Sequence, residues 1–340
     1  MKRLQTSYIQ KHKTALGIAA LAALLAAVFT ASLCIGPAGV CPADVAAVLW
    51  GGQRDTLAAR IVLYTRLPRA CAAMAAGAAL AVSGTVLQTV LANPLAAPNI
   101  IGVNASAGLA VTLLGALAPG LARYTPAFAF FGALAGVALI VLLASRTGAS
   151  RLTVALAGVA LSSLFGATID AVITLAPDAL NGYTDFRIGG VSGATLARIG
   201  PACGVIGAAL VLTLALSRSL DVLALGSETA RSLGLSVRRV QAAALVLAAA
   251  LAGAAVSFAG LLGFVGLIVP HIMRRLTGGE TGPQVLANAL GGAAFVLLCD
   301  LIARTLFVPY ELSVGIVLAF TGTPFFLWLL LHQRKGRVHD

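Results

Sequence analysis

Charged residues are scarce in this chain of 340 residues. Asp, Glu, Lys and Arg together make up 10% of it, whereas average soluble domains carry about 25%. Hydrophobic residues make up 59%, and about ten stretches approach the roughly 20 apolar residues that a helix needs to cross a bilayer. This composition excludes a soluble globular domain. It predicts an all-α polytopic membrane protein with about ten transmembrane helices, forming a single domain over residues 1–340.

The sequence also lacks the common motifs of catalysis and nucleotide binding. The dipeptide Gly-Lys does not occur, which excludes a phosphate-binding loop of the G-x-x-x-x-G-K-[ST] type. Neither H-E-x-x-H nor G-x-S-x-G is present, and the five cysteines form no C-x-x-C pair. We therefore expect a chain that is not an enzyme, with no catalytic residue, no metal site and no bound cofactor of its own.

The net charge of +12 would favour a nucleic-acid partner in a soluble protein. Here no basic run is interleaved with exposed aromatic residues, so we expect no nucleic-acid binding. Basic residues instead hold cytoplasmic segments against anionic membrane lipid. The distribution of Lys and Arg predicts a multi-pass protein of a bacterial cytoplasmic (inner) membrane with both termini in the cytoplasm. Four arginines at 54, 60, 66 and 69 crowd the expected outer side.

Ionisable residues inside the expected spans are few. Asp170 stands alone in its helix, and Asp300 precedes Arg304 by four residues, which suits an ion pair on one helix face. An ion-coupled carrier would be expected to place carboxylates in several helices. The chain is therefore predicted to be a conduit without its own energy source. An ion-coupled secondary transporter remains the alternative, and a membrane-embedded enzyme is a weaker one.

The segment from Ser219 to Gly234 is the longest charged stretch between spans. Ser219 is expected to cap a short helix that Gly226 ends, and Ser227 to cap a second one that Gly234 ends. Such a pair of amphipathic helices would expose apolar side chains, namely Leu220, Leu223, Leu225 and Leu233. A docking surface for a cytoplasmic partner explains them; a plain solvated loop is the alternative.

Several motifs occur in one order along most of the chain: RLPR at 66–69, NPLAAP at 93–98, GFVGLIVPHIMR at 263–274, DLIAR at 300–304, ELSVGI at 311–316 and GTPFFL at 322–327. Together they resemble the FecCD family of ABC-importer permeases, the type II importers for ferric siderophores, haem and cobalamin. The resemblance implies a type II importer fold and a dimer, with itself or with a sister permease. It also implies two ATP-binding cassette subunits that bind the ATP, and an extracytoplasmic substrate-binding protein.

Three sets of residues follow from the resemblance. Binding-protein docking maps onto Arg66, Arg69 and Arg304; snorkelling of these arginines to the membrane interface is the weaker alternative. Coupling to the ATPase maps onto Leu220, Leu223, Ala224, Leu225, Gly226, Ala230, Leu233 and Gly234. The translocation pathway maps onto Gly158, Gly166, Asp170, Gly315, Gly322 and Thr323, where the small residues suit close helix packing as well as a pore wall.

Two departures from the family pattern stand out. The family commonly has Trp-x-x-Gly where this chain has Phe186 and Gly189, and it commonly has Pro where this chain has Ser313. The departures do not change the class of protein that the resemblance implies. They weaken any inference of ligand-contacting residues from the family to this chain. A ferric siderophore is the first expectation for the cargo, with cobalamin or haem behind it. Pairing of Cys34 with Cys41 stays open.

Overall fold

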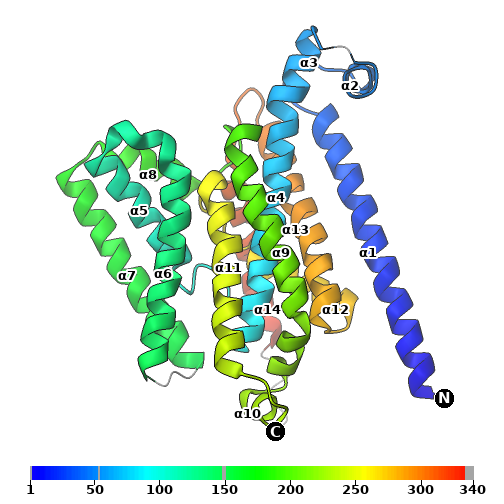
Figure 1. Ribbon diagram of the computed structural model, residues 1–340. Coiled ribbons are helices and arrows are strands. Elements are labelled where there is room, and N and C mark those ends of the chain that lie inside the picture. The colour runs from blue at the N-terminus through cyan, green and yellow to red at the C-terminus, as the bar shows by residue number, and fades with distance from the viewer. Residues whose placement is uncertain (1, 53, 148–150, 334–340) are drawn as a thin grey trace.

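The computed structural model describes residues 2–52, 54–147 and 151–333. Within these ranges every regular element is a helix (Figure 1). The elements are α1 Lys2–Cys34, α2 Pro42–Leu49, α3 Leu57–Ile61, the π-helical turn η1 Val62–Arg66, α4 Leu67–Leu91, α5 Val103–Leu117, the 3₁₀ helix η2 Pro119–Tyr124, α6 Thr125–Thr147, α7 Arg151–Leu175, α8 Ala179–Ile188, α9 Leu196–Ala224, α10 Ser227–Ser232, α11 Val237–Ala259, α12 Val265–Thr277, α13 Thr281–Thr305 and α14 Val314–Gln333.

In the described residues, seven helical segments are long and apolar enough to span a membrane. They coincide with all or most of α1, α4, α6, α7, α9, α11 and α13. The shorter apolar helices α5 and α14, together with the 13-residue α12, complete the set of about ten that the sequence predicts. The all-α polytopic fold is thus confirmed. The expected basic tail at 334–340 lies outside the described residues.

Helix α4 is the centre of the larger bundle (Figure 1) and packs against α9, α11, α12 and α13. Its contacts depend on glycine. A Cβ on Gly77 would overlap the carbonyl oxygen of Gly292 on α13, and a Cβ on Gly292 would overlap that of Gly77. A Cβ on Gly84 would likewise overlap the carbonyl oxygen of Gly266 on α12. Backbones can approach this closely in a membrane only where both helices carry small residues.

Buried polar side chains add hydrogen bonds between these helices. The Ser83 hydroxyl donates to the Ala248 carbonyl of α11 at 2.7 Å. The Asn288 amide of α13 donates to the Thr85 hydroxyl at 2.7 Å. In a lipid environment such bonds stabilise helix pairs because water cannot replace them.

Helices α5 to α8 form a second group on the other side of α11 (Figure 1). The end of α8 is tied to the larger bundle by backbone hydrogen bonds: Gly190 N–H donates to the Ala259 carbonyl at 2.8 Å, and Leu261 N–H donates to the Phe186 carbonyl at 2.9 Å. Gly189 has a φ of 68°, and a Cβ there would overlap the Leu261 carbonyl. Glycine is therefore required at this joint.

The prediction for the region around Ser219 was wrong in one respect. No separate helix begins there, because α9 runs without a break from Leu196 to Ala224. Leu220 and Leu223 are fully buried, and this packing outweighs the capping preference of Ser219. The second short helix exists as α10, but Gly226 occupies its N-cap position in place of Ser227.

Candidate functional sites at the two ends of the bundle

The upper end in Figure 1 carries α2, α3 and α8, and the lower end carries α10 and the N-terminus. The RLPR motif lies at the upper end, where η1 passes into α4. Leu67 N–H bonds back five residues to the Val62 carbonyl, so this turn is wider than an α-helical turn. Pro68 explains the widening. It has no N–H to donate to Tyr64, and its ring would clash with the Tyr64 carbonyl in a regular helix.

Arg66 closes the C-terminal end of α1. Its Nη1 donates to the carbonyls of Leu33 at 2.7 Å and Cys34 at 2.9 Å, and its Nη2 donates to Ala38 at 2.6 Å. The last carbonyls of a helix lack intrahelical donors and carry partial negative charge. A cation at this position therefore fixes the end of α1 against η1.

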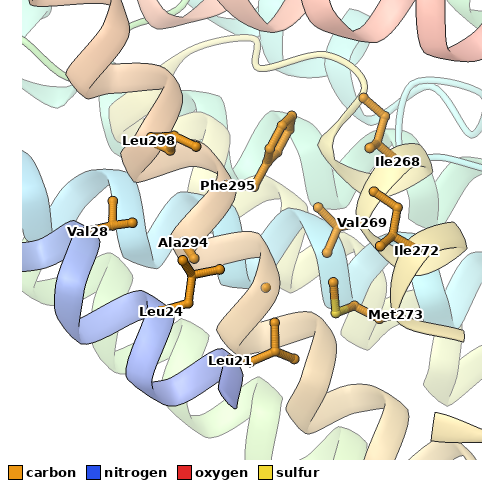
Figure 2. Close-up of a pocket in the computed structure, with 11 residues that line it drawn as sticks. Leu21, Leu24, Val28, Ile268, Val269, Ile272, Met273, Ala294, Phe295 and Leu298 are labelled. Carbon is orange, nitrogen blue, oxygen red and sulfur yellow. The ribbon is translucent and has the colours of Figure 1, made fainter. Parts of the chain in front are cut away.

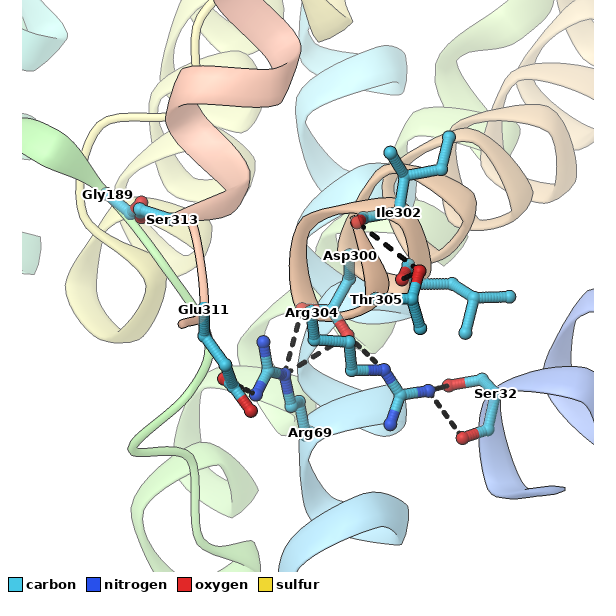
Figure 3. Close-up of polar contacts among 10 residues, drawn as sticks. Ser32, Arg69, Gly189, Asp300, Ile302, Arg304, Thr305, Glu311 and Ser313 are labelled. Atoms are coloured by element: carbon cyan, nitrogen blue, oxygen red, sulfur yellow. Dashed lines mark hydrogen bonds and ion pairs between the residues drawn. The ribbon is translucent and has the colours of Figure 1, made fainter. Parts of the chain in front are cut away.

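Arg69 and Arg304 share one buried carboxylate (Figure 3). Arg69 Nε lies 2.9 Å from Asp300 Oδ1, and Arg69 Nη1 lies 2.6 Å from Glu311 Oε2. Arg304 Nε lies 3.8 Å from Asp300 Oδ2, which confirms the expected ion pair, and its Nη2 donates to the backbone carbonyl and hydroxyl of Ser32. The cluster joins α1, α4, α13 and the segment before α14.

The burial of these arginines changes how docking could work. Arg66, Arg69 and Arg304 are 3%, 5% and 3% exposed, and all three have intrachain partners. Glu311 is the accessible edge of the cluster, since its side chain is 39% exposed. Direct docking on the three arginines stays a prediction, and it would require these intrachain contacts to be exchanged.

The lower end exposes apolar side chains around α10. Leu225 is 65% exposed and Leu233 is 63% exposed, whereas Leu220, Leu223 and Ala230 are fully buried. Ala224 is also exposed. Gly226 and Gly234 adopt φ of 110° and 83° at the two ends of α10, a region that favours glycine. The expected exposure is thus found for two of the four leucines, and it defines a small apolar knob, Ala224, Leu225 and Leu233.

The residues mapped onto the pathway fall into two groups. Gly158, Gly315 and Gly322 pack closely: a Cβ on Gly158 would overlap the Ile100 carbonyl, one on Gly315 the Ile188 carbonyl, and one on Gly322 the Phe264 side chain. In contrast, Gly166 has no neighbour within 4 Å of its Cβ position. Asp170 and Thr323 are exposed as well. Only this second group faces open space.

The two departures from the family pattern lie in contact with each other. The Ser313 hydroxyl donates to the Gly189 carbonyl (Figure 3), and Phe186 is buried one turn earlier on α8. A proline at 313 would remove this hydroxyl. The residues at the end of α8 and at the start of α14 are therefore coupled by direct contact.

Sequence reasoning missed two structural contacts. Asp221 Oδ1 accepts the Thr281 N–H at 2.8 Å and so ties α9 to the start of α13. Ser32 binds Arg304 across 272 residues of chain. Neither contact has a local signal, because both partners are brought together only by the packing of α1, α9 and α13.

The architecture is that of a helical membrane transport subunit, with one end held by buried charge and the other carrying an apolar knob. Residues 24–332 match the model of the FecCD transport family. The chain belongs to this family.

Named relatives agree along nearly the whole length. The chain is 39% identical to the achromobactin transport system permease protein CbrC of Dickeya dadantii, covering 96% of this chain and 94% of that one. It is 38% identical to the hemin transport system permease protein HmuU of Yersinia pestis, covering 85% and 88%. It is 37% identical to the Fe(3+) dicitrate transport system permease protein FecD of Escherichia coli, covering 87% and 93%.

A solved structure has the same fold. A metal-chelate type ABC transporter in an inward-facing conformation superposes with a TM-score of 0.83 and 27% sequence identity, covering 93% of this chain and 98% of that one. Family membership thus rests on both the sequence and the arrangement of the helices. The chain is a transport permease.

Proposed function

We propose that this chain is the membrane subunit of an ABC importer that moves a ferric siderophore or a related iron chelate across a bacterial cytoplasmic membrane. The observation that carries the proposal is the full-length similarity to permeases named for achromobactin, hemin and ferric dicitrate. Two copies, or one copy and a sister permease, form the unit. Both termini face the cytoplasm, so the lower end in Figure 1 is the inner one.

Energy comes from two ATP-binding subunits that dock on the inner end. The apolar knob supports this docking because Leu225 and Leu233 are exposed beyond the last turn of α9. Buried Leu220 and Leu223 attach the knob to the bundle. Movement of the ATPase would therefore be transmitted along α9, and through Asp221 to the start of α13.

A substrate-binding protein docks on the outer end. In this step Arg69 gives up its ion pair with Glu311 and binds a carboxylate of the binding protein instead. The geometry favours this exchange because Glu311 is the exposed member of the cluster. Arg66 and Arg304 hold α1 beneath this surface. The cargo then passes between the two permease copies along faces that include Gly166, Asp170 and Thr323.

The inner docking surface is tested by charge substitution. Leu225→Asp with Leu233→Asp should abolish co-purification of the co-expressed ATP-binding subunits while the protein still inserts. A matched control is Leu196→Asp, because Leu196 is 52% exposed at the opposite end of α9. Unchanged ATPase association in the double variant would show that the knob is not the docking surface.

The energy source is tested in proteoliposomes that contain the permease, the ATPase and a ferric siderophore on its binding protein. Uptake should require ATP and should not respond to a proton or sodium gradient. Gradient-driven transport by this chain alone would instead identify an ion-coupled carrier.

The outer docking step is tested in the same vesicles with Glu311→Arg. This variant should impair uptake more than Asp185→Arg, a substitution at an exposed carboxylate of α8.

A further inference from the structure

A cavity of about 190 Å³ lies between α1, α12 and α13. It is larger than an engineered protein cavity of about 150 Å³ that binds benzene. Figure 2 shows its wall, to which all three helices contribute apolar side chains, among them Leu24, Val269, Ile272, Ala294, Phe295 and Leu298. We call it the α1 groove.

The α1 groove has a deep floor and an open edge. Val269 is 2% exposed and Ala294 is 4% exposed, whereas Leu24, Ile272 and Leu298 are between 42% and 52% exposed. A slender and flexible apolar chain fits such a shape, and α1 spans the membrane where acyl chains surround it.

Basic residues lie at the lower mouth of the groove. Gly17 of α1 packs within 4.0 Å of Leu276 on α12, measured from the Cβ position of Gly17. Leu276 follows Arg274 and Arg275, both exposed, and Lys13 is exposed one turn before Gly17. From this mouth, the exposed side chains of Leu276 and Ile272 form an i, i+4 row that leads up to the groove.

Acidic residues are sparse here. Residues 1–43 contain no Asp or Glu, and Glu280 is the sole acidic residue between 262 and 299. The mouth therefore carries net positive charge on the side where a phosphate headgroup would lie. Apolar burial by itself gives little selectivity inside a bilayer, because lipid tails are as apolar as leucine. Selectivity has to come from the headgroup.

We propose that the α1 groove binds one anionic phospholipid, with an acyl chain between α1, α12 and α13 and the phosphate at Lys13, Arg274 and Arg275. This inference rests on the membrane-spanning fold and goes beyond the proposed import function. Each basic residue near an anionic headgroup contributes about fivefold in affinity.

Tryptophan fluorescence locates the lipid. The chain has two tryptophans, at 50 and 328, and replacing both by phenylalanine leaves a background for Phe295→Trp. The purified permease is placed in vesicles of phosphatidylcholine that contain a small, equal fraction of brominated phosphatidylglycerol or of brominated phosphatidylcholine. The brominated phosphatidylglycerol should quench the indole of the Phe295→Trp variant several-fold more strongly. A control Phe131→Trp, on an exposed site of α6, should be quenched equally by both.

Two variants test the two parts of the site by native mass spectrometry of the permease with phosphatidylglycerol. Ala294→Phe fills the groove and should remove the retained lipid, whereas Ala208→Phe on an exposed face of α9 should not. Lys13→Gln with Arg274→Gln and Arg275→Gln should lower retention at least tenfold. The same three changes at Arg218, Arg231 and Arg239, which are also exposed on the inner side, should have little effect.

Equal quenching of the Phe295→Trp variant by the two brominated lipids would overturn the proposal. Retention of the lipid by the Ala294→Phe variant would also overturn it. A third contrary result would be a lipid-free dimer that Ala294→Phe dissociates, because a second copy of the chain would then cover the groove. These measurements use the permease without ATPase or cargo. A negative result therefore leaves the import function untouched, and a failure of ATP-driven uptake leaves the lipid site untouched.

Discussion

The two ends of this bundle use residue types in opposite ways. At the upper end in Figure 1, three arginines point into the protein and are at most 5% exposed. At the lower end, Leu225 and Leu233 point away from it and are more than 60% exposed. Charge at the upper end holds helices together, while the apolar side chains of the knob do not pack into the bundle. The comparison teaches that the arginine cluster is first of all structural, whereas the apolar knob is free to serve the docking that we propose.

Loss of Asp300 should have the largest effect on stability. Asp300→Ala leaves Arg69 and Arg304 buried beside each other without their shared carboxylate. Removing one partner of a buried ion pair costs about 3–5 kcal/mol, so the free energy of unfolding should fall by this amount. Unfolding by SDS in mixed micelles measures it. Asp178→Ala is the control, because Asp178 is exposed. An equal loss of stability in both variants would show that the cluster has no special structural role.

A methyl group at the α4–α13 contact should have the next largest effect. Gly292→Ala would overlap the Gly77 carbonyl, and the two helices would have to separate. Overpacking of this kind costs about 1–3 kcal/mol. Gly204→Ala on α9 is matched to it, since no atom lies within 4 Å of that Cβ position. The same unfolding assay should show that Gly204→Ala is neutral or stabilising by up to about 1 kcal/mol.

Glu311 should contribute less than Asp300 although it also binds Arg69. Glu311→Gln removes an ion pair whose acidic side chain is 39% exposed. Partly exposed pairs contribute roughly 0–1 kcal/mol, so unfolding should change little. A loss as large as that of Asp300→Ala would show that Glu311 belongs to the structural core and does not act as a displaceable edge.

Substitution in the apolar knob should cause the smallest change in stability. Leu225→Asp alters an exposed side chain, and surface substitutions usually change the free energy of unfolding by about 0.5 kcal/mol or less. ATPase-dependent uptake should nevertheless fall. A variant that is destabilised by several kcal/mol would contradict the division between the two ends.

The sequence predicted the helices well and the roles of their polar ends less well. Long apolar runs ended by charged or Pro/Gly segments predicted about ten spans and an all-α fold, because length and apolarity decide membrane insertion. The π turn before Pro68 and the extension of α9 through Ala224 depend on tertiary packing. The arginines of RLPR were expected to be available to a partner, but a sequence does not reveal that the end of α1 binds Arg66 and that Asp300 and Glu311 bind Arg69.

The wide turn at η1 has a consequence for the phase of the helix. One additional residue in a helical turn rotates everything beyond it by about 100°. Ala59, above the turn, and Val62, its first residue, pack with Leu33, Val40, Val45 and Val48. Arg69, below it, meets α13. A single-residue deletion between 62 and 66 would therefore turn one of these faces away from its packing partner. The position of one proline thus sets the rotation of the whole α4 span about its own axis.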